Sequence, residues 1–447
     1  MRENERKDLP DVETGAAADM DAVMRKYDRE SATRIWTGKP KIVVSAVSAL
    51  FSLYCIWSTL WSTADLPIRL TAFLGLIVIM GYLNYPARKG HVTPNAMPWY
   101  DIIIMALGAG AFFFYCFRYT RLVKVITSAA KIDPSNPDAV AGAWFYVILG
   151  IVGILCLAEL CRRCVGLPIL FVVGALLVYT FASGQGLPRV VYTLFFATSG
   201  VMATPIQVCA KFIAVFIVFG AFLERTGISN FFIDLANCAA GSSSGGPAKV
   251  AVISSALCGM VSGSSVGNTV TTGSVTIPMM KKTGYKGEFA AAVEAAASTG
   301  GQIMPPIMGA AAFLMAEYMS TSYANVALKA ILPALLYFTG IFLAVHLEAK
   351  RLGLRGVPRD QLPKMKLLIR SIYLLLPLVV LVVMVSTGTR TLQFSAAIAI
   401  VLTILVSLPH IFRDSRAQHG EGFAVHVVKE TATMIASSLE AGGRSCI

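Results

Sequence analysis

Long apolar runs bounded by lysine or arginine recur along this chain, and they constrain its fold more than any other feature. The chain is 56% hydrophobic and only 14% charged, with a mean hydropathy of +0.67, whereas soluble domains are about 25% charged. A helix of roughly 20 apolar residues crosses the hydrocarbon core of a bilayer. The sequence therefore predicts an all-α polytopic membrane protein. Because Lys and Arg gather beside the apolar runs, the net charge of +13 indicates orientation in the membrane, and no nucleic-acid partner is expected.

Basic residues predict how these runs are oriented. Six of them precede the first run and place residues 1–41, with the N-terminus, in the cytoplasm: Arg25, Lys26, Arg29, Arg34, Lys39 and Lys41. Four runs follow, at 42–61, 68–86, 99–117 and 143–161. The segment 118–142 between the last two, with Asp133-Pro134, is expected to be a turn-rich loop. Five further runs lie at 165–184, 204–223, 324–347, 371–387 and 391–411.

Two apolar segments are interrupted by small polar residues, at Ser262–Ser274 (SGSSVGNTVTTGS) and at Ser298–Pro306 (STGGQIMPP). Irregular backbone at membrane depth survives only where it lines a cavity or is buried in protein. Unwound segments expose carbonyl oxygens, and Ser, Thr and Asn add side-chain oxygens, which hard cations prefer as ligands. Paired breaks are typical of secondary transporters. The alternative interpretation is close helix packing through small residues.

The charges around the first break indicate how it enters the membrane. Arg225 and the basic turn Lys281–Lys286 are both expected in the cytoplasm, so the chain between them crosses an even number of times. Its apolar part, 248–280, is too short for two full crossings, which need roughly 40 residues. A re-entrant hairpin with its tip in Ser262–Asn268 is predicted, and two short broken spans are the alternative. The segment 288–319, interrupted by prolines, is predicted to be one broken crossing.

Three polar positions have both an ordinary and a functional explanation. Lys211, near the end of a run, either extends to the membrane interface or contacts substrate. Asp234 and Asn237 lie among apolar residues in 228–240, which predicts an amphipathic helix in the interface. Glu294 lies deep in the broken crossing, where it is expected to face a water-filled cavity, pair with a lysine or relay a proton.

No motif for enzymatic chemistry is found. Cys161 and Cys164 have neither a second cysteine pair nor histidines at ligand spacing, so a metal or redox site is not expected. A phosphate-binding loop and a hydrolase nucleophile elbow are also missing from the sequence. The chain is therefore not expected to be an enzyme or to bind ATP.

Several motifs resemble the large membrane subunit of tripartite ATP-independent periplasmic (TRAP) transporters. They are FGAFLERTG from Phe219, GGPAKVAV from Gly245, SGSS from Ser262, IPMMKKTGY from Ile277 and EAAASTGGQIMPP from Glu294. With HLEAKRLGL from His346, the resemblance is closest to fused permeases, in which a small four-helix subunit precedes the large one. The resemblance implies three parts: a cytoplasmic segment at 1–41, a four-helix small-subunit-like module at 42–163, and a large-permease-subunit-like transport module at 164–447.

The same resemblance implies a permease of the bacterial inner membrane that takes up organic acids (carboxylates) together with sodium. A periplasmic solute-binding protein of the TAXI type would deliver the substrate, and a transport domain carrying the hairpin would move against a scaffold, as in an elevator. Carried onto this sequence, the sodium ligands would be Ser262, Ser265, Gly301, Met304 and Pro305. Candidates for contact with the substrate are Ser264, Asn268, Thr299 and Gly300.

One departure and two alternatives accompany this resemblance. Large subunits of this family have two inverted repeats, each with a hairpin and a broken helix. Here only the first is expected, because the sequence reaches Ile447 after a helix that starts at about 427; a C-terminally incomplete large subunit is therefore expected. The alternatives are a sodium/dicarboxylate symporter that needs no binding protein, and a membrane module that only docks a partner. Uptake without a soluble partner would favour the first, and an unaltered activity after replacement of Ser262 and Ser265 by alanine would favour the second.

Overall fold

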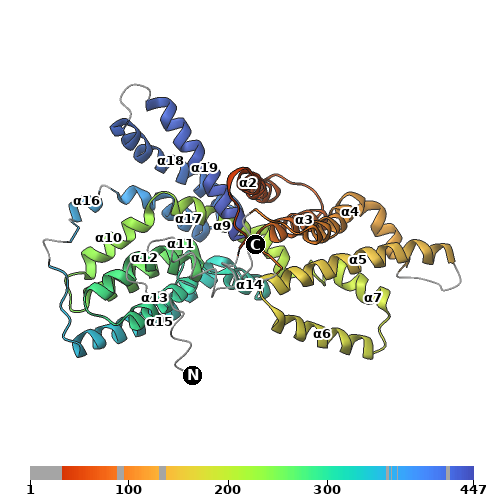
Figure 1. The fold of residues 1–447 in the computed structure, drawn as a ribbon, viewed down its shortest axis with the longest axis horizontal. Coiled ribbons are helices and arrows are strands. Elements are labelled where there is room, and N and C mark those ends of the chain that lie inside the picture. The colour runs from red at the N-terminus through yellow and green to blue at the C-terminus, as the bar shows by residue number, and fades with distance from the viewer. Residues whose placement is uncertain are drawn as a thin grey trace.

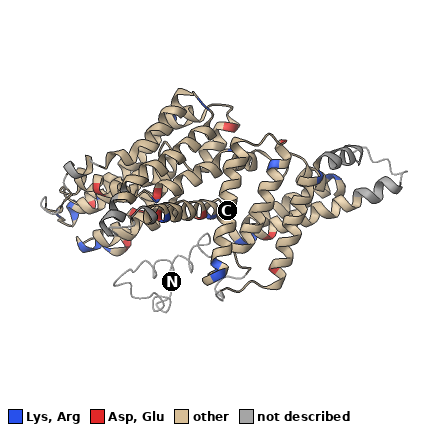
Figure 2. Ribbon diagram, turned by 90° about the horizontal axis from the view of Figure 1, so that it is seen from above, with Lys and Arg blue, Asp and Glu red and all other residues tan. Residues whose placement is uncertain are grey.

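The computed structural model describes residues 33–87, 95–129, 137–358, 362–363, 365–369, 371–418 and 423–446. Helices account for nearly all regular structure, and no strand occurs in these residues. Seven helical segments among them are long and apolar enough to cross a membrane, at 38–60, 66–84, 99–119, 144–164, 204–224, 323–351 and 392–409. The predicted all-α polytopic architecture is therefore confirmed. Figure 2 shows how sparsely charged residues are distributed along the helices.

The N-terminal part forms α2 (Gly38–Leu60), α3 (Leu66–Asn84), α4 (Trp99–Ala129) and α5 (Pro137–Cys164). The next segments are α6 (Leu167–Ala182), α7 (Leu187–Val191) with a π-helical turn at Tyr192–Phe196, and α8 (Thr204–Val208), which continues through a π-helical turn at Cys209–Ile213 into α9 (Ala214–Glu224). Then follow α10 (Ile228–Ala240), α11 (Gly246–Ser262), α12 (Ser265–Lys282), α13 (Gly287–Gly300), α14 (Ala310–Tyr318) and α15 (Tyr323–Arg351). The last are α16 (Met365–Ile369), α17 (Leu376–Thr387) after a 3₁₀ turn at Ile372–Leu375, α18 (Leu392–Gln418) and α19 (Phe423–Ser445).

One prediction about helix boundaries was wrong, and one helical segment was not predicted. The segment 118–142 is not one long loop, because α4 continues to Ala129 and α5 begins at Pro137. Leu, Lys and Arg prolong α4 readily, and proline is well suited to the first turn of a helix. The turn signal at Asp133-Pro134 lies outside the described residues. The helical segment Leu187–Phe196 was not predicted.

The helices divide into two lobes that meet at a central group (Figure 1). In one lobe α3, α4 and α5 pack together and against the π-helical turn at Tyr192–Phe196. In the other, α10, α13 and α15 pack around the hairpin formed by α11 and α12. Between the lobes, α9 packs against α2, α18 and α19. Helix α2 is thus held mainly by α19 and α9, and it makes fewer contacts with α3.

Helix α19 lies close to α2 and α9 because two of its residues are glycine. A Cβ atom on Gly442 would lie 2.9 Å from the Cα of Val218, and one on Gly443 would lie 2.2 Å from the carbonyl oxygen of Ser48. The hydroxyl of Ser52 donates a 2.6 Å hydrogen bond to the carbonyl of Leu439. Small residues permit this close approach of backbones, as is common among helices in membranes.

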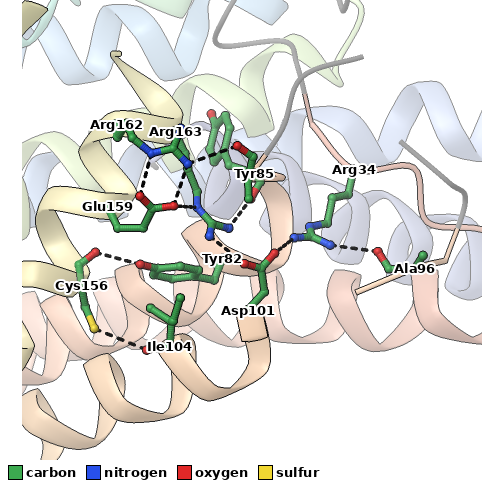
Figure 3. Close-up of polar contacts among 11 residues, drawn as sticks. Arg34, Tyr82, Tyr85, Ala96, Asp101, Ile104, Cys156, Glu159, Arg162 and Arg163 are labelled. Atoms are coloured by element: carbon green, nitrogen blue, oxygen red, sulfur yellow. Dashed lines mark hydrogen bonds and ion pairs between the residues drawn. The ribbon is translucent and has the colours of Figure 1, made fainter. Parts of the chain in front are cut away.

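A buried network of ion pairs fastens the residues before α2 to the ends of α4 and α5 (Figure 3). The fully buried carboxylate of Asp101 accepts hydrogen bonds from Arg34 and, at 2.6 Å, from Arg163. Glu159 accepts from Arg163 at 2.8 Å and from Arg162 at 2.7 Å. Arg163 also lies 4.5 Å above the centre of the Tyr82 ring. From the sequence, Arg34 was interpreted only as a marker of orientation, and its carboxylate partner Asp101 was not predicted.

Candidate functional site

The first polar break forms the tip of a helical hairpin. Helix α11 ends at Ser262, α12 begins at Ser265, and only Gly263 and Ser264 connect them. Gly263 has φ +63°, a left-handed conformation that glycine adopts without steric cost. Ser264 caps α12, because its hydroxyl accepts a 3.2 Å hydrogen bond from the amide of Gly267. The chain path here is a helical hairpin with its tip in Ser262–Asn268, as both the re-entrant hairpin and the alternative of two short spans require.

The second polar break interrupts a helix as predicted. Helix α13 ends at Gly300, a 3₁₀ turn follows at Gly301–Ile303, and α14 does not begin until Ala310. Pro305 and Pro306 lie in the non-helical stretch between these helices. Proline has no amide hydrogen for a helix, so the segment cannot continue the hydrogen-bonding pattern of α13.

The two breaks meet where two glycines cross. A Cβ atom on Gly259 would lie 2.4 Å from the Cα of Gly301, and one on Gly301 would lie 2.5 Å from the Cα of Gly259. Contacts this short are essentially never made by real Cβ atoms. Only glycine at both positions therefore allows the hairpin to approach the broken helix so closely.

Two hydrogen bonds join the broken helix to the hairpin beside this crossing, and a third lies within the hairpin. The amide of Ile307 donates to the carbonyl of Met260 at 3.2 Å, and the side-chain amide of Gln302 donates to the hydroxyl of Ser265 at 3.3 Å. Buried Asn268 donates from Nδ2 to the carbonyl of Ser255 at 2.8 Å. Its Oδ1 atom is also buried, but no donor among the described residues reaches it. A buried amide oxygen without a donor is available to a cation or to water.

The structure brings together only some of the predicted site residues. Ser265 and Gly301 take part in the contact between hairpin and break, and Asn268 lies beside the glycine crossing. The hydroxyl of half-buried Ser262 donates to the carbonyl of Ser264 at 3.3 Å, within the tip. Ser264 itself is exposed.

The other predicted residues lie elsewhere. Thr299 is exposed and donates to the carbonyl of Ala295 in its own helix at 2.8 Å. Gly300 packs against α15, where an added Cβ would lie 2.4 Å from the ring of Tyr337. Met304 and Pro305 are half-buried in the stretch between α13 and α14. Among the described residues, no hydrogen bond joins Met304 or Pro305 to the hairpin.

A second polar cluster, not predicted from the sequence, lies in the interior of the same lobe. The fully buried Glu294 of α13 accepts hydrogen bonds from four buried hydroxyls: Ser255 of α11, Thr272 and Thr276 of α12, and Ser298 of α13. The Ser255 and Thr276 bonds are both 2.5 Å long and the Ser298 bond is 3.1 Å. The proposed pairing of Glu294 with a lysine is wrong for the part of the chain described.

A sequence signal for this cluster exists. Thr272 and Thr276 are four residues apart, as are Glu294 and Ser298. Residues at that spacing share one face of a helix. Two polar pairs of this kind on neighbouring apolar helices indicate a common buried cluster, although the partner residue Ser255 gives no periodic signal of its own.

Lys211 and Asp234 both lie exposed on the surface of the described structure. Lys211 lies in the π-helical turn before α9, is exposed, and has its amine 4.9 Å from the centre of the Phe212 ring. Helix α10 is amphipathic in its packing, with Phe231, Phe232 and Ala236 buried while Asp234 is exposed. Neither residue contacts the hairpin tip through a hydrogen bond among those described.

A broken helix crossed by a helical hairpin, within a set of apolar spanning helices, is typical of secondary transporters among polytopic membrane proteins. Comparison with known families matches residues 152–439 to the family described as the tripartite ATP-independent periplasmic transporter, DctM component. The match covers most of the chain, so this protein belongs to that family. The family consists of transporters rather than enzymes and is ATP-independent by its description. Membership and the seven apolar helices together identify a multi-pass protein of the inner membrane.

Relatives with curated descriptions share this family. The chain is 29% identical over 202 residues to the C4-dicarboxylate TRAP transporter large permease protein DctM of Pseudomonas aeruginosa, which covers 45% of this chain and 47% of that protein. It is 28% identical over 262 residues to the protein of the same description from Vibrio cholerae, covering 56% and 54%. A third relative, the isethionate TRAP transporter permease protein DctMQ of Oleidesulfovibrio alaskensis, is 28% identical over 197 residues, covering 44% and 30%. The chain thus spans about half the length of the first two relatives and less of the third.

Proposed function

We propose that this protein is the permease component of a sodium-driven secondary transporter, and that it takes up small organic acids delivered by a periplasmic solute-binding protein. The contact between the hairpin and the broken helix would supply one sodium site. Family membership supports the transport class. The observation that carries the sodium proposal is the buried Oδ1 of Asn268, which no donor among the described residues reaches. The Nδ2 atom of the same side chain lies beside the crossing of Gly259 and Gly301.

The groups around this crossing fit a small hard cation. Asn268 offers an amide oxygen, Ser262 and Ser265 offer hydroxyl oxygens, and the 3₁₀ turn at Gly301 and the stretch through Met304 and Pro305 offer backbone carbonyls. Unwound segments of this kind coordinate sodium in secondary transporters. Among the described residues no group of three His, Cys, Asp or Glu side chains is placed to hold a transition metal.

The N-terminus of α12 supports an anionic substrate. Helix N-termini carry partial positive charge and unpaired amides, which favour a carboxylate. Ser264 and Ser265 lie at this end, and Ser264 is exposed. The described relatives are named for C4-dicarboxylates and for isethionate, which are small organic anions. We therefore propose that substrate approaches the tip of the hairpin.

The finer features of the proposal concern organisation and partners. Residues 42–163 would correspond to a small subunit fused before the large one at 164–447, with residues 1–41 cytoplasmic. The family match begins at residue 152, within α5, so α2 to α4 lie outside it. The binding protein would be of the TAXI type, and the hairpin would move with a transport domain as in an elevator.

Uptake into proteoliposomes tests the proposal. The protein is reconstituted with and without its soluble binding protein, and uptake of radiolabelled succinate is measured under an inward gradient of sodium or of choline. We expect uptake only with sodium and the binding protein. Sodium-driven uptake without the soluble partner would contradict the tripartite assignment, and equal uptake in choline would contradict sodium coupling.

A double variant localises the site. Replacing Ser262 and Ser265 by alanine removes two hydroxyl oxygens at the tip and is expected to reduce sodium-driven uptake at least tenfold, the effect of about 1.4 kcal/mol. Ser274→Ala is the matched control, because Ser274 is exposed on the same helix and bonds only to the carbonyl of Thr271 at 2.9 Å. Equal uptake by the double variant and the control would show that the tip hydroxyls take no part.

A further inference from the structure

The cluster around Glu294 presents a charge problem that the sodium proposal does not address. Glu294 is fully buried, and no Lys, Arg or His among the described residues forms an ion pair with it. A lone ionised carboxylate in an apolar interior is costly, and such groups reduce the cost by taking up a proton or a cation. Hydrogen bonds from the surrounding hydroxyls therefore have to stabilise Glu294.

Each threonine in the cluster has two acceptors for its single hydroxyl proton. Thr276 lies 2.5 Å from Oε2 of Glu294 and 3.0 Å from the carbonyl of Thr272. Thr272 bonds to Oε1 of Glu294 and lies 2.8 Å from the carbonyl of Asn268. A hydroxyl carries one proton and accepts through its lone pairs. Each threonine can therefore donate either to the carboxylate or to its own helix backbone.

This choice allows both protonation states to be satisfied. When Glu294 is ionised, Thr276 donates to Oε2, and Oε1 accepts from Ser255, Thr272 or Ser298. When a proton binds to Oε2, the new O–H donates to the hydroxyl oxygen of Thr276, which turns its own proton to the carbonyl of Thr272. One proton is gained, the negative charge is removed, and no buried donor loses its partner.

The two oxygens of Glu294 are also unequal. Among the described residues, three hydroxyls lie within hydrogen-bond distance of Oε1, whereas only that of Thr276 reaches Oε2. A carboxylate oxygen has about two lone-pair directions, so Oε1 is already crowded with donors while Oε2 has room for a proton. The arrangement therefore favours proton binding at Oε2.

We propose that Glu294 and its four hydroxyls form a proton-binding site that holds the hairpin against the broken helix. Three of the four donors come from α11 and α12, whereas Ser298 and the carboxylate belong to α13. The strong hydrogen bonds to the ionised form link its charge to the packing of these helices, because charge-assisted bonds are about twice as strong as neutral ones. Proton release tightens the contact and proton uptake loosens it.

Other ionisable groups around the cluster do not provide a competing charge. From α11, the thiol of Cys258 is within electrostatic range of Glu294. From α15, the hydroxyl of Tyr337 donates to the carbonyl of Ala296 at 2.8 Å. The lysines of α12, Lys281 and Lys282, are exposed at its far end, and Lys249 at the start of α11 donates to Ser243 at 3.2 Å.

Infrared difference spectroscopy tests this inference without requiring transport. The purified protein is titrated in sodium-free choline buffer from mildly alkaline to mildly acidic conditions, and the carbonyl stretch of a protonated carboxyl group is followed. We expect a band that grows on acidification in the wild type and is missing in Glu294→Gln. Glu288→Gln is the matched control, because Glu288 is an exposed residue of the same helix. The Glu288→Gln protein should still show the band assigned to Glu294, unchanged from the wild type.

A second measurement covers the case in which Glu294→Gln does not fold. Thr276→Val removes the hydroxyl next to Oε2 in a side chain of similar shape, and it should shift the band frequency and the pH at which it appears. A band that is identical in Glu294→Gln, or one that does not change with pH, would overturn the inference. So would a band in Thr276→Val that matches the wild type in both properties. The inference rests on the proposed transport function only for the biological role of the proton site. If the band titrates in a protein that fails the uptake assay, the proton site is established and the transport proposal is refuted.

Discussion

At the scale of single residues, the contact between the hairpin and the broken helix depends on side chains that are missing or small. Gly259 and Gly301 face each other where any Cβ would collide with backbone. Asn268 lies beside them with an oxygen that no described donor reaches. The family resemblance suggested Ser265, Asn268 and Gly301 as site residues, and the structure brings these three together where the hairpin meets the broken helix. The sequence could not show that Gly301 faces the hairpin while Gly300 faces α15, because consecutive residues of a helix point in different directions.

Replacing Gly301 by alanine is predicted to separate the hairpin from the broken helix. The added methyl group would lie 2.5 Å from the Cα of Gly259, and backbone atoms cannot turn aside as a flexible side chain can. We expect a loss of about 1–3 kcal/mol in the free energy of unfolding, the usual cost of overpacking. Unfolding in detergent, followed by circular dichroism, measures it.

Gly340→Ala provides the control for this change. An added Cβ at Gly340 in α15 meets nothing within 4 Å, and alanine favours helices over glycine by about 0.5–1 kcal/mol. Its stability should equal or exceed that of the wild type. A Gly301→Ala protein as stable as Gly340→Ala would contradict the close crossing.

At the scale of helices, apolar runs predicted the spanning segments because burial in a bilayer leaves a strong compositional signal. The same signal ended too early at α4 and began too late at α5, because both helices extend beyond their apolar parts. The short helix α7 was missed because Leu187–Val191 is only five residues long. The buried ion network was missed for another reason: Asp101 and Arg163 are 62 residues apart, and no local pattern connects them.

Asp101→Ala is predicted to destabilise the packing of α4 against α5 and of the residues before α2. Both Arg34 and Arg163 would lose this carboxylate as the partner of their buried charge. Breaking a buried ion pair from one side costs about 3–5 kcal/mol. The melting temperature in detergent should fall clearly relative to the wild type.

Arg351→Ala tests whether this effect depends on burial. Arg351 pairs with Glu348 at 3.4 Å, but its side chain is 78% exposed. Pairs of this kind contribute about 0–1 kcal/mol, so the melting temperature should hardly change. Similar effects of Asp101→Ala and Arg351→Ala would show that the network does not stabilise the fold.

At the scale of the whole molecule, two lobes are connected through α2, α9 and α19 (Figure 1). The sequence predicted a division near residue 163, but it did not predict that α2 would lie mainly against the C-terminal helix α19. That contact joins residues about as far apart as the chain allows, such as Ser52 and Leu439. Contacts of this range depend on the complete fold, so composition and periodicity cannot reveal them.

The orientation of the molecule in the membrane remains a prediction from its charges. Lys39 and Lys41 at the start of α2 should hold this end in the cytoplasm, because basic residues favour that side. A reporter that fluoresces only in the cytoplasm, fused before residue 1, should fluoresce, and the same reporter inserted between α2 and α3 at Ala64 should not. The reverse pattern would contradict the predicted topology.

The sodium site can be examined directly by the thermal stability of the purified protein in sodium chloride and in choline chloride. A ligand that binds the folded state at ten times its dissociation constant stabilises it by about 1.4 kcal/mol. We predict a higher melting temperature in sodium, an effect that Asn268→Ala abolishes and Ser274→Ala preserves. Equal melting temperatures in the two salts, or an undiminished sodium effect in Asn268→Ala, would contradict a sodium site between the hairpin and the broken helix.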